Sequence, residues 1–209
     1  NYSPIVAYGQ SALSFRSTAG IGYNFGNHSK FGTTLPFFKQ FVEGGPHRMR
    51  AWGLRLLGLG SSLVSDTSDI FRDRYGDMQL ETNLEYRFNI KQFSSLKLGG
   101  AIFTDIGNIW NIRKNAEIPN GQFDISRLGT DLAIGVGTGL RFDFNYFLIR
   151  VDFGIKLKDP ARYENNGWLK LSDFTWKNYE YGVFNPITNR IEPLPRNNYA
   201  IQLGIGLPF

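Results

Sequence analysis

A long, regular alternation of apolar and polar residues is the feature that most constrains this chain. Between Leu132 and Phe144 every second residue is apolar, with one threonine among them, and the residues in between are alanine, glycine, arginine or aspartate. A period of two is that of a β-strand with one apolar face. The segment is longer than the strands of about five or six residues typical of soluble proteins, and it matches the roughly 9–11 residues that cross a bilayer at a tilt.

The same pattern recurs in five further segments, which are residues 15–25, 79–88, 96–107, 149–158 and 199–209. Each has one apolar face and one face that is mostly polar, charged or glycine. In a soluble barrel the apolar face points inward, whereas in a membrane barrel it contacts lipid. Periodicity alone does not distinguish the two. Strand length, the aromatic residues of the apolar faces and the loop pattern favour an all-β fold, a transmembrane antiparallel β-barrel.

The connections between these segments alternate in length. Residues 27–76, 110–127 and 159–198 form long loops, whereas residues 89–95 and 145–148 form short turns. Outer-membrane barrels have short periplasmic turns and long extracellular loops, and single-chain bacterial barrels have an even number of at least about eight strands. An open sheet edge in lipid would leave backbone groups unpaired. We therefore expect residues 1–209 to be the C-terminal portion of one larger barrel domain, with further strands and periplasmic domains outside this chain.

Residues 1–12 have two interpretations, because they are either the end of a preceding strand or a connection.

The residue types of the chain argue against catalysis. There is no cysteine, the histidines are His28 and His47, and neither a Gly-x-Ser-x-Gly elbow nor a paired-histidine metal motif occurs. The aspartates at 66–69 lack the spacing of a calcium loop, and the glycines at 135–139 alternate within a strand. The sequence therefore predicts no catalytic residue, no metal site and no cofactor. The net charge of +5 is spread among intermixed charges, which argues against nucleic acid as a partner.

One loop segment is more specific. FVEGGPHRMRAWGLRLLGLGS, at Phe41–Ser61, resembles the sixth extracellular loop of the BamA/TamA superfamily of outer-membrane insertases. That loop carries a hydrophobic–Arg–Gly–aromatic tetrad after a Gly-Gly pair. The matching tetrad is Met49, Arg50, Ala51 and Trp52, and the pair is Gly44 and Gly45. Ala51 departs from the family's glycine, and the Arg-Ala-Trp form resembles the TamA-like branch of the Bacteroidetes.

Elements after this loop follow the family's order. They are a strand with a Glu-Tyr pair at 85–86, a Phe-x-Asp-x-Gly element at 103–107 and a terminal GLPF. The resemblance implies about six strands of a 16-stranded barrel in the outer membrane of a Gram-negative bacterium. It implies a role in inserting or translocating client outer-membrane proteins. Besides these clients, the implied partners are outer-membrane lipid, lipopolysaccharide and TamB-like or other accessory subunits.

The resemblance also gives Arg50 a role, in which it holds the loop inside the barrel. The alternation places Glu85 and Asp105 on the lumen side of neighbouring strands, where a long loop can bring Arg50 to them. A guanidinium between carboxylates makes a directional, charge-assisted contact. The alternative is that Arg50 is an ordinary loop cation and that both carboxylates are solvated.

The last segment has an apolar, aromatic face formed by Tyr199, Leu203, Ile205, Leu207 and Phe209. This pattern fits the C-terminal signal of outer-membrane proteins and equally a last lipid-facing strand. In the family this strand meets the first one at a seam that opens to admit a client strand. Gly204 and Gly206 either weaken packing at the seam or mark bends and close loop contacts. Two other functions remain open, a passive pore and the barrel anchor of a fused phospholipase.

Overall fold

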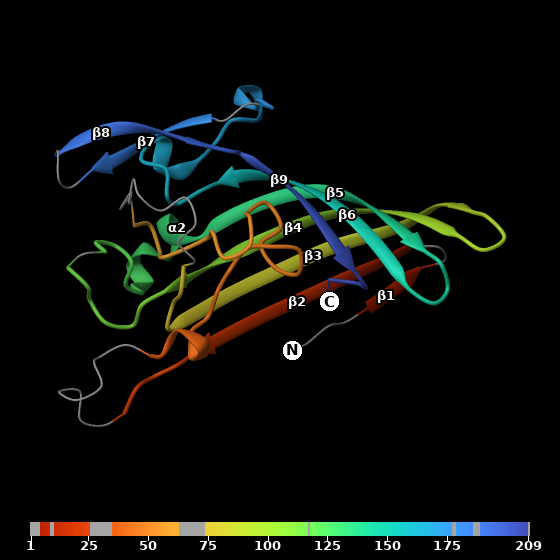
Figure 1. The fold of residues 1–209 in the computed structure, drawn as a ribbon, viewed down its shortest axis with the longest axis horizontal. Helices are drawn as coiled ribbons and strands as arrows, with labels where there is room; N and C mark the ends of the chain where they lie inside the picture. Colours follow the sequence, from red (N-terminus) through yellow and green to blue (C-terminus); the bar gives the residue numbers. More distant parts are fainter. Residues whose placement is uncertain are drawn as a thin grey trace.

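The computed structural model describes residues 5–8, 11–25, 35–62, 74–116, 118–176, 179–185 and 189–208. Its main element is one curved, antiparallel, seven-stranded sheet (Figure 1). In sheet order the strands are β1 (Ile5–Tyr8), β2 (Ser11–Ile21), β3 (Met78–Gln92), β4 (Lys97–Trp110), β5 (Ala133–Asp143), β6 (Leu148–Lys158) and β9 (Tyr199–Ile205). All six segments expected from the alternation form strands of this sheet.

The N-terminal segment adds a seventh strand. β1 pairs with β2 from Ile5↔Ser14 to Tyr8↔Ser11, so residues 1–12 contain a preceding strand and the first residues of β2. The boundaries differ at two other places. β2 ends at Ile21 instead of reaching Phe25, and β9 ends at Ile205 because Gly206 turns the chain with a φ of 80°.

Short and long connections lie at opposite ends of the sheet (Figure 1). The turns at 93–96 and 144–147 lie at one end of the sheet, and the described parts of the long loops lie at the other. The long loops carry short helices, which are η1 (Phe37–Lys39), η2 (Ile125–Arg127), α2 (Leu128–Asp131), η3 (Glu164–Gly167) and η4 (Leu171–Asp173).

The loop at 159–198 contains a hairpin of its own, formed by β7 (Tyr179–Asn185) and β8 (Arg190–Arg196). The alternation pattern did not predict it. Pro193 and Pro195 lie within β8, and proline normally argues against a strand because it donates no backbone hydrogen bond. A two-stranded hairpin tolerates them because both of its strands are edges.

Burial along the main sheet is the reverse of that in a soluble barrel. Apolar side chains point outward and are exposed, among them Leu13, Ile21, Leu84, Tyr86, Ile102, Leu140, Val151, Ile201, Leu203 and Ile205. Polar side chains on the other face are buried, among them Ser14, Gln79, Glu81, Asn83, Glu85, Asp105, Arg141, Arg150, Asp152 and Gln202. This is the arrangement of a transmembrane β-barrel, with lipid outside and a polar interior. No helix in the described ranges is long and apolar enough to cross a membrane.

The outward apolar face yields a test of this orientation. Ile102 lies in the middle of β4 and is 57% exposed. Arginine at a lipid-facing position near the bilayer midplane destabilises a barrel by about 2–4 kcal/mol. We therefore expect Ile102→Arg to lower the free energy of unfolding of the full-length protein in lipid vesicles by about that amount, as measured by denaturant titration.

Ile125 is the matched control, because it is 73% exposed but lies in the helix η2 of a long loop. Ile125→Arg is expected to change the free energy of unfolding by less than about 0.5 kcal/mol. Equal, negligible effects of the two substitutions would contradict the assignment of the apolar face to lipid.

Candidate functional site

Residues 35–62, here called the inner loop, belong to the connection between β2 and β3 and lie against the polar face of the sheet (Figure 1). The loop turns back on itself at residues 43–57, its tip, where Glu43 and Leu57 form a bridge. Within the tip, the Gly45 N–H donates to the Trp52 carbonyl at 3.0 Å and the Trp52 N–H donates to the Met49 carbonyl at 3.1 Å.

The Gly-Gly pair has a conformational role in this tip. Gly44 and Gly45 have φ values of 99° and 96°, a region that residues with a Cβ rarely adopt. A Cβ on Gly44 would also lie 2.2 Å from the Gly53 carbonyl oxygen. Both glycines are therefore required for the tight return of the loop.

Arg50 is fully buried and contacts both expected carboxylates. Its Nε and Nη2 donate to the two carboxylate oxygens of Asp105 at 2.9 and 2.8 Å, and its backbone N–H donates to Asp105 at 3.0 Å. Its Nη1 donates to Glu85, and its Cζ lies 3.5 Å from the ring centroid of Phe103. Burial by itself lowers the pKa of Arg50, but Asp105 and Glu85 outweigh burial and raise it above its ordinary value.

Further ion pairs continue from Glu85 along the inner wall. Arg87 and Arg141 donate to Glu85 at 2.8 and 3.1 Å, and Arg141 also donates to Asp152 at 2.6 Å. Arg150 donates to the other oxygen of Asp152 at 2.5 Å. Charges of opposite sign therefore alternate from β3 across β5 to β6, and each of these buried carboxylates has cationic partners.

Glycines of the wall admit the backbone of the tetrad. A Cβ on Gly154 of β6 would lie 2.9 Å from the Ala51 Cα, and one on Gly135 of β5 would lie 2.8 Å from the Ala51 Cβ. Ala51 itself is not among the residues with a positive φ. The tip therefore does not need glycine at this position for its backbone conformation, and the close approach depends on the glycines of the wall.

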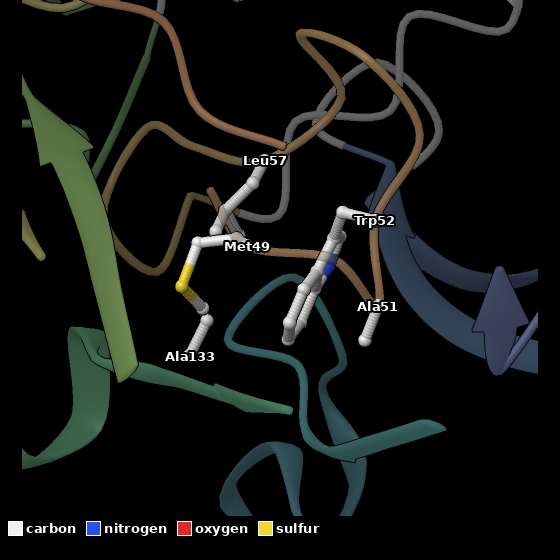
Figure 2. Close-up of a cluster of buried hydrophobic side chains, with 5 residues drawn as sticks. All are labelled: Met49, Ala51, Trp52, Leu57 and Ala133. Carbon is white, nitrogen blue, oxygen red and sulfur yellow. The ribbon is translucent and has the colours of Figure 1, made fainter. Parts of the chain in front are cut away.

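Apolar side chains of the tip form a small buried cluster with the end of β5. Figure 2 shows Met49 extending toward Ala133, with Trp52, Ala51 and Leu57 around it. The Trp52 Nε1–H donates to Asp159 at 3.4 Å, and the Lys156 ammonium lies 5.4 Å from the Trp52 ring. The whole tetrad is thus buried against the wall.

The last strand also contacts the tip. The Gln202 side-chain amide of β9 donates to the carbonyls of Trp52 at 2.8 Å and Arg50 at 3.4 Å. A Cβ on Gly204 would lie 2.6 Å from the Arg150 guanidinium, which donates to the Gly206 carbonyl at 3.1 Å. Gly204 therefore marks a close contact, and Gly206 marks a turn.

The residues of the expected C-terminal signal lie mainly on the outer surface. Leu203, Ile205 and Leu207 are exposed, and Phe209 lies outside the described residues. Tyr199 packs against Phe153 of β6 and against two rings of the last long loop, Phe174 and Trp176, with centroid separations of 5.5–5.9 Å.

Sequence reasoning missed Gln202, Arg141 and Arg150 as site residues, and it missed the contact that Gly154 makes. All four lie at inward-facing positions of the apolar–polar alternation, and this position is the one sequence feature that could have identified them. Within the described ranges there is no cluster of three or more His, Cys, Asp or Glu residues that could hold a metal ion. His28 and Asp66–Asp69 lie outside those ranges.

A curved antiparallel sheet with an apolar exterior, a charged interior and a loop fixed to its inner wall defines a transmembrane β-barrel. The family model of the Omp85 superfamily domain matches residues 1–209, and the chain belongs to this superfamily. The superfamily comprises outer-membrane β-barrels that generally take part in the insertion or secretion of outer-membrane proteins. A comparison with curated proteins found no match to the chain.

The tip begins at a buried acidic group, Glu43. Glu43 is fully buried and accepts a hydrogen bond from Gln79. Burial and the nearby Glu81 carboxylate raise the pKa of Glu43 to about 8. Burial, Arg150 and Arg16 lower the pKa of His47 from its ordinary 6.5, so well above that pH His47 is neutral whether or not the loop is folded.

The two arginines at 50 and 48 test the contact with the wall. Arg50→Ala leaves Glu85 and Asp105 buried with a lost partner, and breaking a buried pair in this way costs about 3–5 kcal/mol. Arg48 is more exposed and lies 3.6 Å from Glu43, so Arg48→Ala is expected to cost less than about 1 kcal/mol. Heat-modifiability and denaturant unfolding of the full-length barrel measure the difference. Arg55→Ala is a further control. Equal losses in the free energy of unfolding for the three variants would contradict a special role of Arg50.

The pH dependence follows from the sign of the Glu43 shift. A raised pKa means that the folded loop favours the neutral carboxyl, so this contribution to stability is complete below about pH 4.5 and is lost as pH rises to about 8. Between pH 6.5 and 8 we expect the midpoint of unfolding to fall in the wild-type barrel and to change much less in Glu43→Gln. An equally steep fall in both proteins would contradict the assignment.

Proposed function

We propose that this chain is the C-terminal part of the barrel of an outer-membrane factor that inserts or translocates client proteins. It acts by lateral opening of a seam at β9, where a client strand pairs. The observation that carries the proposal is the burial of Arg50 between Glu85 and Asp105. This contact holds a loop on the inner wall, where a passive pore would need open space.

The edges of the described sheet support the position of the seam. β1 and β9 are its outermost strands, and β9 pairs with β6 from Ile149↔Ile205 to Ile155↔Tyr199. The outer edge of a terminal strand can exchange backbone partners without breaking an internal ladder. Because lipid does not satisfy unpaired backbone groups, we propose that strands outside this chain close the barrel, to 16 in all.

The proposed branch and partners rest on the resemblance of the tetrad to the loop motif of the BamA/TamA superfamily. Ala51 in the form Arg-Ala-Trp supports a place in the TamA-like branch of the Bacteroidetes. Client outer-membrane proteins would pair at β9, and TamB-like or other accessory subunits would act from the periplasm. Outer-membrane lipid and lipopolysaccharide would contact the apolar face.

A passive pore is the second candidate, and a barrel that anchors a fused phospholipase is the third. The polar interior of the sheet is compatible with a pore, but the inner loop argues against one. We propose no catalytic role for this chain itself. A fused enzyme would have to lie outside it.

A disulfide across the seam tests lateral opening. The chain has no cysteine, so a pair can be introduced in the full-length protein without interference. Ala200 is the site to use on β9, because Gln202 and Gly204 contact the loop tip and Arg150. With Ala200→Cys joined to a cysteine on the first strand of the barrel, we expect client insertion into liposomes to fall at least tenfold and to recover on reduction.

The control is a disulfide within an internal ladder, from Ile102→Cys to Thr138→Cys, whose Cα positions are paired between β4 and β5. It should leave insertion unchanged, because that ladder stays closed throughout. Full insertion activity with the seam quantitatively crosslinked would overturn lateral opening and favour the passive pore.

A further inference from the structure

We propose that Gln202 is a positioning residue that couples the last strand to the loop tip, so that β9 leaves its place only when the tip also loses its backbone partners. The inference rests on the proposed function, because it concerns the same seam. It adds a residue and a route by which the seam and the loop affect each other.

The geometry of the amide carries the inference. Gln202 lies on the inner face of β9 and is 9% exposed, opposite Asp152 of β6. Its Nε2 donates to the carbonyls of Arg50 and Trp52, which flank Ala51. One side-chain amide therefore satisfies two backbone acceptors on either side of the residue that lies against Gly154.

Arg50 joins this backbone contact to the opposite part of the wall. Its guanidinium binds Glu85 on β3 and Asp105 on β4, while its carbonyl accepts from β9. The tip is thus held by two sets of contacts. One joins β3 and β4 to the Arg50 guanidinium and backbone N–H, and the other joins β6 and β9 to the backbone of residues 50–52.

Movement of β9 breaks the second set. Neighbouring strands lie about 4.8 Å apart, so displacement of β9 by even half of that distance takes Gln202 out of hydrogen-bond range. The Arg50 carbonyl would then lose this donor and the Trp52 carbonyl would keep only the Gly45 N–H, which disfavours the docked loop. Coupling between two sites is reciprocal, so weakening the tip must also loosen β9.

In this account Gln202 acts through the N–H donors of its side-chain amide. Substitutions that remove or keep such donors test this role. Gln202→Glu has the same shape but no N–H, and its carboxylate faces two carbonyl oxygens. Gln202→Lys keeps N–H donors on a side chain of similar length. Gln92→Glu makes the matched chemical change at an exposed end of β3 and serves as the control.

The first measurement reports on the tip in the full-length protein in liposomes, and it does not depend on clients. Met49 is fully buried in the tip, so Met49→Cys provides a single cysteine that is labelled with a maleimide. Folding of each variant in this background is checked by heat-modifiability. We expect Gln202→Glu to raise the labelling rate at least fivefold, and Gln202→Lys and Gln92→Glu to change it less than twofold. Equal rates in Gln202→Glu and Gln92→Glu would overturn the coupling, whether or not the protein inserts clients.

The second measurement runs in the opposite direction and separates coupling from a merely local structural role. Hydrogen exchange of the β9 backbone amides should be faster in Arg50→Lys, which loses the bidentate contact, than in wild type or Arg48→Lys. A purely local role for Gln202 predicts unchanged β9 exchange in Arg50→Lys, and that result would overturn the proposal. Faster labelling in Gln202→Glu and faster β9 exchange in Arg50→Lys, together with full insertion by the protein whose seam is crosslinked, would instead count against the seam mechanism alone.

Discussion

The buried guanidinium of Arg50 is the interaction on which the rest of the inner wall depends. Glu85 and Asp105 project from neighbouring strands into a space that the loop closes off from water. Two buried carboxylates without a cation would be strongly unfavourable, and the loop supplies the cation that they share. The planar fork of arginine also fixes the direction of the contact, because it meets Asp105 through two parallel hydrogen bonds.

This contact determines what the remaining residues of the wall must be. With Arg50 at Glu85, the backbone of the tip lies directly over β5 and β6, where Gly135 and Gly154 leave room for it. Glu85 also meets Arg141, which begins the series of ion pairs that ends at Arg150 and the carbonyl of Gly206. The loop, the middle strands and the end of β9 thus form one connected polar network inside an apolar exterior.

The alternation was sufficient to predict six strands of the main sheet and to separate their apolar from their polar faces, because a period of two is a local property. Strand length, the aromatic residues and the loop pattern were needed to assign the apolar faces to lipid. The inward positions of Glu85 and Asp105 followed from the same alternation, and the resemblance of the tetrad supplied Arg50. The hairpin β7–β8 was missed because Pro193 and Pro195 obscure its strand pattern. The contacts of Gln202 and Gly154 with the loop were missed because they join residues far apart in the chain, and no local pattern encodes such an approach.

A double-mutant cycle on Arg50 and Asp105 tests the central claim most directly, since it isolates the interaction between the two groups. The free energy of unfolding is measured for the full-length barrel, for Arg50→Ala, for Asp105→Ala and for the double variant. If the buried pair organises the wall, the two losses are not additive, and the coupling energy is about 1–3 kcal/mol. Losses that add to within about 0.5 kcal/mol would contradict the account.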